Sequence, residues 1–308
     1  MKKNKINTNI NGYIEGYYGK LLDWESRKII VKSLSKNKMN TYFYAPKEDE
    51  KHRLNWRKKY NLKWRNCFRN FTQFSKENKI NIIAGIAPGL DFNFKKINNP
   101  SWEKESLDFN SLLNKAKQLL DDGATSIALL LDDIPDNFQK NFGDKISEGT
   151  SHGILANKFL ENLGQLIYFV PRIYADELIN DAPNYLSDLS KVLNQNIKVF
   201  YCGKNVICKK ITNSSKIKKI LLNKIVYWDN YYANDYCPRR LFIGPYVGRA
   251  SLTNLMINPT GLIKTDLLIL DIMINTINKN TSIKVWKKTL DEHGVPLVFL
   301  KIKKFFLK

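Results

Sequence analysis

The chain has 308 residues, of which 50 are Lys or Arg and 29 are Asp or Glu, so its formal net charge is +21. Hydrophobic residues make up 43% of the sequence, which is enough to bury a full core and excludes a disordered basic protein. With 15 glycines and 10 prolines, the chain is neither fibrous nor of low complexity. The charge leaves two interpretations open: a surface for an anionic partner, or scattered lysines in a chain rich in Lys, Asn and Ile.

The beginning of the chain, MKKNKINTNINGYIEGYYG, is basic and lacks the apolar stretch of a signal peptide. No run approaches the ~20 apolar residues of a membrane span, and the longest, residues 267–274, is interrupted by Asp271. The cysteines have neither CxxC spacing nor the density of a disulfide framework, so we expect reduced thiols without a zinc site. They are Cys67, Cys202, Cys208 and Cys237. These features predict a cytoplasmic protein.

Short apolar runs alternate with amphipathic segments along the chain, without any sequence repeat. Several of the runs are rich in β-branched and aromatic residues and stop at glycine or proline, which predicts strands. The expected strands are 12–19, 41–46, 80–88, 125–134, 165–171, 197–203, 224–230 and 254–259. The helices expected from their apolar spacing are 23–35, 106–122, 157–166, 187–195, 217–223 and 265–277.

Eight strands that alternate with helices are typical of a (β/α)8 TIM barrel, which is the α/β fold that we predict. A doubly wound open sheet, usually of about five or six strands, is the alternative. No dinucleotide fingerprint follows a strand, because Gly16-Tyr17-Tyr18-Gly19 lacks the GxGxxG spacing, and the sequence has no P-loop.

We expect a single catalytic domain with an addition at each end. A basic arm would occupy residues 1–10, the barrel residues 11–281, and a C-terminal helix with a basic tail residues 282–308. The tail ends in KIKKFFLK and is expected to pack on the floor of the barrel. The alternative is a contact with a membrane surface or a partner.

Active sites of such barrels lie at the C-terminal ends of the strands, so polar residues that follow the apolar runs are candidates for function. The candidates are EGYYG after the first strand, APKED after the second, Asp132-Asp133 after the fourth, Tyr174 after the fifth, Trp228-Asp229-Asn230 after the seventh and Asn258-Pro259 after the eighth. Random surface polarity would not follow the strand ends in this way.

The most informative candidate is the carboxylate pair in SIALLLDDIPD. Asp132 and Asp133 follow an apolar strand, where a charge is costly unless it is paired or functional. They can face one substrate only where the strand ends and the backbone bends. Neighbouring carboxylates do not suit the usual glycosidase scheme, but they suit substrate-assisted hydrolysis of a 2-acetamido sugar. The alternative is that one of them caps a helix or forms a structural ion pair.

The sequence resembles the family 84 glycoside hydrolases, the group of O-GlcNAcases and bacterial β-N-acetylglucosaminidases. The matching segments follow the family's order and cover roughly residues 11 to 260. They are GYIEGYYG, MNTYFYAPKEDEKHRLNWRKKY, IIAGIAPGLDF, IALLLDDI, VYWDNYYANDYCPRRLFIGPYVGR and LMINP. The resemblance implies a catalytic barrel that needs no metal or cofactor and works with retention through an oxazoline intermediate.

Position by position, the resemblance also implies roles. Asp132 would orient and polarise the acetamido group, Asp133 would be the general acid and later the base, and the Tyr174 hydroxyl would approach the acetamido oxygen. The substrate-binding residues would be Gly16 and Lys47 at the 3-hydroxyl, Asp235 and Asn258 at the 4- and 6-hydroxyls, Trp228 and Asn230 in the acetamido pocket, and Tyr18 as a wall. His52 and Arg53 lie in a matching segment and are expected to be structural or supporting.

The chain departs from the family's pattern at four places, none of which removes a catalytic group. They are Tyr17-Tyr18-Gly19 for Phe-Tyr-Gly, Lys47-Glu48-Asp49 for Lys-Asp-Asp, Tyr201-Cys202-Gly203 for Trp-Thr-Gly, and Arg172-Ile173 for Thr-Glu. They bear on the specificity for the leaving group. The sequence ends soon after the barrel, without the helical domain of the animal enzymes, so activity on proteins is the weaker expectation.

We therefore predict a retaining exo-β-N-acetylglucosaminidase whose partner is a GlcNAc-containing glycan or glycoprotein. The alternative is a basic glycan- or polyanion-binding barrel with little or no hydrolase activity. Apart from two aspartates and Lys47, the matched pocket residues are mostly uncharged. A nucleic-acid partner is therefore not favoured. The net charge of +21 is interpreted mainly as a consequence of the chain's composition. Protein, cell-wall fragment and hyaluronan-type glycan stay open as aglycones, and the oligomeric state stays open too.

Overall fold

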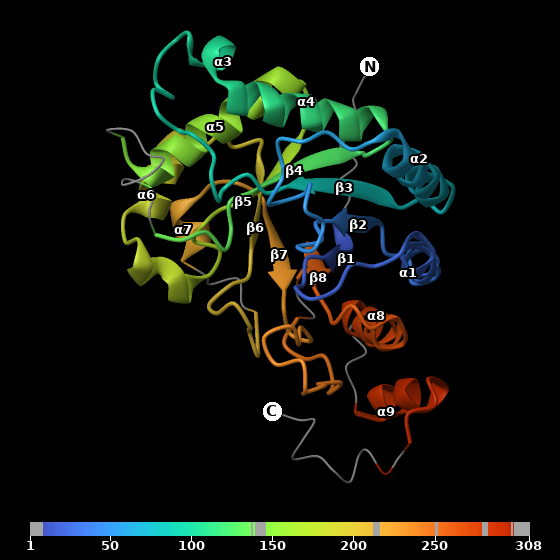
Figure 1. Ribbon diagram of the computed structural model, residues 1–308. Coiled ribbons are helices and arrows are strands. Elements are labelled where there is room, and N and C mark those ends of the chain that lie inside the picture. The colour runs from blue at the N-terminus through green and yellow to red at the C-terminus, as the bar shows by residue number, and fades with distance from the viewer. Residues whose placement is uncertain are drawn as a thin grey trace, which may run out of the picture.

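The computed structural model describes residues 9–136, 138, 146–211, 216–249, 252–278, 283–296 and 298. Eight parallel strands form a closed barrel in the order β1-β2-β3-β4-β5-β6-β7-β8, and helices surround it (Figure 1). This closed barrel confirms the predicted (β/α)8 fold. An open doubly wound sheet is excluded, because β1 also pairs with β8.

Each strand coincides with one of the predicted apolar runs, and most strands are shorter than the run. They are β1 (Asn11–Glu15), β2 (Thr41–Tyr44), β3 (Asn81–Ile86), β4 (Ser126–Leu130), β5 (Ile167–Val170), β6 (Lys198–Tyr201), β7 (Ile225–Asp229) and β8 (Leu255–Ile257). The register begins with Gly12 opposite Thr41. A Cβ at residue 12 would lie 1.7 Å from the Thr41 main-chain oxygen, so only glycine fits there.

The described helices include all those expected, with shifted ends, and several more. They are α1 (Trp24–Lys36), α2 (Leu62–Glu77), α3 (Trp102–Glu105), α4 (Leu107–Asp121), α5 (Glu148–Leu163), α6 (Tyr185–Val192), α7 (Ile217–Ile220), α8 (Ile263–Ile277) and α9 (Ile283–Glu292), with a 3-10 turn η2 (Asp176–Asp181). Side chains cap several of them. Asp23 accepts a hydrogen bond from the Ser26 amide before α1, and Ser106 accepts one from the Phe109 amide before α4.

Two helices differ from the expectation for a physical reason. α2 was not expected, because charged residues separate its few apolar ones, yet Phe68 and Phe71 lie buried on one face. α5 begins at Glu148 rather than at residue 157. Its first turns contain Gly149 and Gly153, which are poor helix formers. A Cβ at Gly149 would lie 2.2 Å from the main-chain oxygen of Tyr185, so these glycines let α6 pack closely.

The core has two layers, because side chains along each strand alternate between the barrel interior and the surrounding helices. Tyr13 belongs to the outer layer and Ile14 to the inner layer. Inside the barrel, the rings of Phe43 and Phe200 stack at 5.0 Å, and Phe200 meets Trp228 edge to face at 5.9 Å. The interior is therefore filled by packed side chains and is not a channel.

A C-terminal helix is present as α9, and its contacts lie on α8 and on the β7–β8 connection. The Trp286 indole donates to the Ile243 main-chain oxygen at 3.0 Å, and His293 Nε2 lies 2.9 Å from Asp271 Oδ2 of α8. α9 thus packs against α8 and the β7–β8 connection, and Figure 1 shows it beside α8. Residues 1–8 of the expected arm and the tail 301–308 lie outside the described residues. Among the helices of the described part, none is long and apolar enough to cross a membrane.

A buried ion pair joins β1 to the first helix. Glu15, at the end of β1, is fully buried and accepts hydrogen bonds from Arg27 Nε at 2.9 Å and Nη2 at 2.8 Å. The Tyr42 hydroxyl donates to the same carboxylate at 2.6 Å. Removing one partner of such a pair leaves a buried charge without compensation.

We expect Arg27→Met to lower the free energy of unfolding by about 3–5 kcal/mol, because Glu15 stays buried without its counter-ion. Denaturant unfolding of the two proteins measures this difference. Lys28→Met is the matched control, since Lys28 pairs with Glu25 on the surface and should cost no more than about 1 kcal/mol. Equal losses in the two variants would contradict the argument.

Candidate active site

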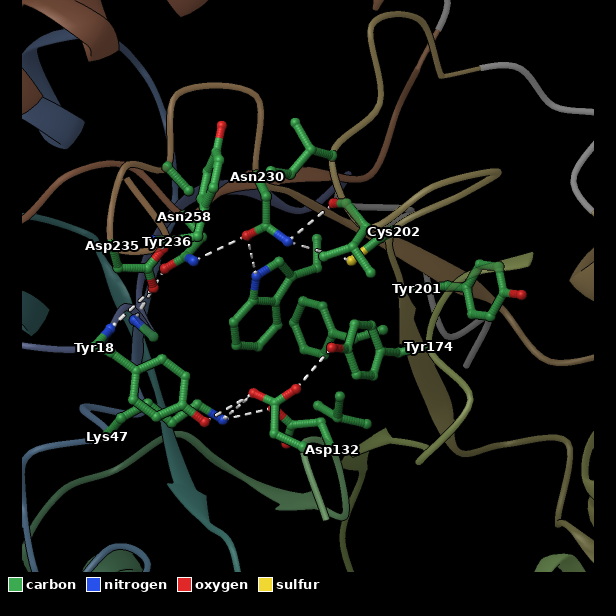
Figure 2. A pocket seen from close by; sticks show the side chains of 18 residues that line it. Tyr18, Lys47, Asp132, Tyr174, Tyr201, Cys202, Asn230, Asp235, Tyr236 and Asn258 are labelled. Atoms are coloured by element: carbon green, nitrogen blue, oxygen red, sulfur yellow. Dashed lines mark hydrogen bonds and ion pairs between the residues drawn. The ribbon is translucent and has the colours of Figure 1, made fainter. Parts of the chain in front are cut away.

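A cavity of about 370 Å³ opens at the C-terminal ends of the strands, and all ten residues singled out from the sequence line it (Figure 2). They are Gly16, Tyr18, Lys47, Asp132, Asp133, Tyr174, Trp228, Asn230, Asp235 and Asn258. They lie in or after six different strands, so the barrel closure brings together residues that lie far apart in the sequence. Phe200 and Trp228 also belong to the barrel core, which therefore forms part of the cavity wall.

Eight further residues line the cavity without having been singled out. They are Val170, Phe200, Tyr201, Cys202, Val206, Ile207, Ala233 and Tyr236. Val206, Ile207 and Tyr236 come from the loops after β6 and β7, where no periodic pattern marks a residue as cavity-facing. The one sequence signal for any of these eight residues was that Tyr201-Cys202-Gly203 differs from the Trp-Thr-Gly of the family pattern.

Asp132 and Asp133 converge because the backbone turns after β4. The strand ends at Leu130, and Asp133 has a φ of 52°, in the left-handed region that Asp adopts more readily than most residues. Lys47 Nζ lies 2.5 Å from Asp132 Oδ2 and 3.7 Å from Asp133 Oδ2. Two consecutive carboxylates thus face the same cavity, which a regular strand would not allow.

Asp132 is held on one side only. Its Oδ2 accepts the hydrogen bond from Lys47, whose side chain is 2% exposed. Its Oδ1 is buried and has no hydrogen-bond partner among the described residues. A buried carboxylate oxygen without a donor is costly. Asp132 can therefore accept one further hydrogen bond from a ligand N–H in the cavity.

Asp133 receives two phenolic hydrogen bonds. The Tyr174 hydroxyl donates to Oδ1 at 2.6 Å, and the Tyr18 hydroxyl donates to Oδ2 at 2.9 Å. Burial opposes ionisation, but the Lys47 charge and these two hydrogen bonds outweigh it and hold the pKa of Asp133 below its usual range. Burial and the nearby Asp133 in turn raise the pKa of the Tyr174 hydroxyl, which stays a proton donor.

The opposite wall is a network of amides. Asn230 Oδ1 accepts from the Trp228 indole at 2.9 Å and from Asn258 Nδ2 at 2.9 Å. Asn258 Oδ1 accepts from the Gly16 amide at 3.1 Å, which ties β8 to β1. A Cβ at Gly16 would lie 2.5 Å from the Trp228 ring, so glycine is needed here for packing. These bonds fix the Trp228 ring in the wall, and Figure 2 shows Asn230 and Asn258 joined by their hydrogen bond.

Asp235 lies at the rim of the cavity. Its Oδ2 accepts from the Tyr18 amide at 3.0 Å and its Oδ1 from the Tyr236 amide at 3.0 Å. The loop that carries it is anchored below by the buried pair of Arg249 and Asp229, at 2.8 Å. Arg249 also donates to the Lys209 main-chain oxygen at 2.5 Å, so the loops after β6 and β7 are held together.

His52 lies beneath the site and does not line the cavity. It is fully buried, and its Nδ1 is 2.9 Å from the Gly85 main-chain oxygen of β3. Burial, together with the charge of Lys47, lowers the pKa of His52 to about 4, so the ring is neutral near pH 7. Its contacts are those of a structural residue that joins the segment after β2 to β3.

Comparisons with known proteins agree with this geometry. A family model described as beta-N-acetylglucosaminidase matches residues 11–264. The rat (Rattus norvegicus) and mouse (Mus musculus) proteins described as "Protein O-GlcNAcase" are each 33% identical over 249 residues. The match covers 78% of this chain and 26% of each relative, so the chain spans about a quarter of their length. The solved structure of CpGH84B has a TM-score of 0.79 at 25% identity, over 92% of this chain and 51% of that one.

Proposed function

This chain belongs to the β-N-acetylglucosaminidase family, and from that membership we propose that it is a retaining exo-glycosidase that removes terminal β-linked N-acetylglucosamine by substrate-assisted catalysis. The observation that carries the proposal is the pair Asp132 and Asp133 in one cavity, with a buried Asp132 oxygen that has no partner among the described residues. A cavity of about 370 Å³ is at the small end of ligand pockets and suits a single sugar.

In the first step, the acetamido oxygen of the substrate attacks the anomeric carbon, and the bond from that carbon to the leaving oxygen breaks. The Asp132 carboxylate accepts a hydrogen bond from the acetamido N–H and stabilises the positive charge that develops on the forming ring. Asp133 gives its proton to the leaving oxygen. The products of this step are a free alcohol, ionised Asp133 and a protonated oxazoline (oxazolinium ion) whose N–H stays hydrogen-bonded to the Asp132 carboxylate, so atoms and charges balance without a cofactor.

In the second step, a water attacks the anomeric carbon from the face that the leaving group occupied. Asp133, now ionised, takes the water proton, and the oxazoline opens back to the acetamido group. Two inversions at one carbon give net retention. In this proposal Lys47, Asn258 and Asp235 bind the sugar hydroxyls, and Trp228 and Asn230 form the wall of the acetamido pocket.

Tyr174 links substrate binding to the protonation of Asp133. A phenol has one proton to donate, so a Tyr174 hydroxyl that turns to the acetamido oxygen no longer stabilises the Asp133 anion. The pKa of Asp133 then rises as the substrate binds, which is when a general acid is needed. The low pKa of Asp133 in the free protein is thus compatible with its role.

We expect Tyr174→Phe to move the alkaline limb of kcat/KM to higher pH. The first step needs protonated Asp133, so activity is lost as pH rises through its pKa, and removal of a hydrogen bond to the anion raises that pKa. The kcat should also fall by about 10-fold or more, because the acetamido oxygen loses a donor. Measurement of kcat and kcat/KM across pH for the wild type and the variant tests both expectations. An alkaline limb that stays in place or moves to lower pH would contradict the expected shift.

Turnover of a 4-nitrophenyl β-N-acetylglucosaminide, followed by NMR, tests the proposed function. We expect hydrolysis of the β-anomer and not of the α-anomer, with the β-configured sugar as the first product. Absence of turnover, or an α-configured first product, would overturn the proposal. Binding of polyanions is not supported at the site, since Lys47 is the sole cation among the described residues that line the cavity, and it is paired.

The natural aglycone is a separate question. The rodent relatives are described as protein O-GlcNAcases, and this chain matches about a quarter of each. We therefore propose activity toward a terminal GlcNAc without assigning the molecule that carries it. A panel of β-GlcNAc conjugates that differ only in the leaving group would rank peptides, chitin fragments and acidic glycans by kcat/KM.

A further inference from the structure

The segment between β2 and α2 carries Arg53, which does not line the cavity but contacts two residues that do. Its Nη2 donates to the main-chain oxygen of Asp133 at 2.7 Å, and its Nη1 donates to the Tyr18 hydroxyl oxygen at 3.1 Å. The Tyr18 hydroxyl donates to Asp133 Oδ2 at 2.9 Å. One guanidinium therefore holds Asp133 at both ends, directly at its backbone and through Tyr18 at its carboxylate.

The surroundings of Arg53 are unusual for a buried arginine. Its residue is 9% exposed, and it forms no ion pair with a carboxylate among the described residues. The other buried arginines of the described residues each have one: Arg27 pairs with Glu15, Arg172 with Glu148 and Arg249 with Asp229. Arg53 instead acts electrostatically on the Asp133 carboxylate without contacting it directly, so its use differs from that of a structural ion pair.

The backbone that Arg53 holds is strained. Asp133 has a φ of 52°, in the left-handed region that L-residues other than glycine adopt only with strain. Such a conformation persists only where its surroundings enforce it. The hydrogen bond from Arg53 to the Asp133 carbonyl is a fixed contact of this kind. Without it, the turn is free to relax and to move the carboxylate away from the leaving oxygen.

We propose that Arg53 is a positioning residue for proton transfer, which aims the Asp133 carboxylate at the leaving oxygen without touching the substrate. The inference rests on the proposed function, because it takes Asp133 as the general acid. It goes beyond the structural or supporting role expected of Arg53 by naming the group that Arg53 positions and the step that depends on it. In kcat/KM, which reports the first step, Arg53 therefore matters only for substrates whose leaving group needs a proton.

The charges around Asp133 give the proposal a second readout. Lys47 from the end of β2, Tyr18 after β1, Tyr174 after β5, Asp132 beside it and Arg53 all face this carboxyl. The Arg53 charge is a smaller influence than Lys47, and it helps to lower the pKa of Asp133. A neutral side chain at position 53 therefore moves the alkaline limb of kcat/KM to higher pH. Lysine at position 53 keeps a positive charge close to Asp133, so the alkaline limb should move less.

The test compares two aryl β-N-acetylglucosaminides, one with 2,4-dinitrophenol and one with unsubstituted phenol as leaving group. We expect Arg53→Met to lower kcat/KM for the phenyl substrate by about 100-fold and for the dinitrophenyl substrate by less than about 5-fold. Dinitrophenolate leaves without a proton, and kcat/KM reports only the first chemical step. Arg53→Lys should also lose activity on the phenyl substrate, because an ammonium cannot hold the carbonyl and Tyr18 in one planar fork.

Arg57→Met is the matched control, because Arg57 lies in the same segment but pairs with Asp91 and Asp108 outside the cavity. Its ratio of the two kcat/KM values should equal that of the wild type. Equal losses on both substrates, or no loss in Arg53→Met, would overturn the positioning role. If Arg53→Met does not fold, the ratio in Arg53→Lys decides. A wild type inactive on both substrates would instead defeat the proposed function.

Discussion

Asp133→Asn should lower kcat/KM for phenyl β-N-acetylglucosaminide by about 10²–10⁴-fold, the range that a general acid contributes. An amide cannot give a proton to the leaving oxygen. The 2,4-dinitrophenyl substrate should lose far less in kcat/KM, because its leaving group needs no proton. Asparagine is the right replacement at this position, since it tolerates the φ of 52° that alanine would adopt only with strain.

The same variant should accumulate the oxazoline from the dinitrophenyl substrate. Asp133 is also the base for the attacking water, so the second step slows while the first stays fast. Stopped-flow measurement of dinitrophenolate release should therefore show a burst, followed by a slow steady state. Added azide, which attacks without a general base, should restore steady turnover and give a β-glycosyl azide. Equal losses of kcat/KM on both leaving groups would remove Asp133 from the acid role.

Asp132→Asn should lower kcat/KM by about 10²–10³-fold on both substrates alike. The acetamido oxygen is the nucleophile whatever the leaving group, and its attack loses the carboxylate that orients the N–H and balances the developing charge. The comparison of the two aryl substrates measures this, and a loss confined to the phenyl substrate would contradict the role. The two aspartates are thus distinguished by whether the loss in kcat/KM depends on the leaving group, and not by the size of that loss.

Stability serves as the control for this second prediction. Asp132 accepts the hydrogen bond from Lys47, whose side chain is almost fully buried, so a change at position 132 also affects folding. Asparagine keeps an oxygen acceptor for Lys47 but loses the charge. Thermal unfolding of Asp132→Asn shows how much folded protein remains at the assay temperature, and rates are compared per folded molecule.

Much of the fold was readable from the sequence, because a barrel strand is local and apolar. All eight predicted runs contain a strand, since a parallel strand buried on both faces has few polar residues in it. The start of α5 was misread because Gly149 is a poor helix former, whereas its real role is to let α6 approach. α2 was missed because Phe68 and Phe71 lie among charged residues. Both errors concern packing partners that are distant in the sequence.

The ten candidate residues were also found from the sequence, through the rule that polar residues at strand ends face one cavity and through a family resemblance. The hydrogen bonds and charge interactions among these residues could not be found from the sequence. Nothing in SIALLLDDIPD shows that Asp133 is left-handed, that Tyr174 and Tyr18 both donate to it, or that Arg53 holds its carbonyl. Gly16, assigned to sugar binding, also has a packing reason in the Trp228 ring.

The sequence by itself determined the alternation of strands and helices, the positions of the polar strand ends and the chemical types of the groups there, because each is a property of a few neighbouring residues. From the sequence the +21 charge is interpreted mainly as composition, and the structure adds that the described cavity lining contains a single cation, Lys47, which is paired. Only the tertiary structure decided which of these groups form hydrogen bonds or ion pairs with one another. Hydrogen bonds and charges act over a few ångströms, and barrel closure brings residues 18, 47, 53, 133 and 174 within that range.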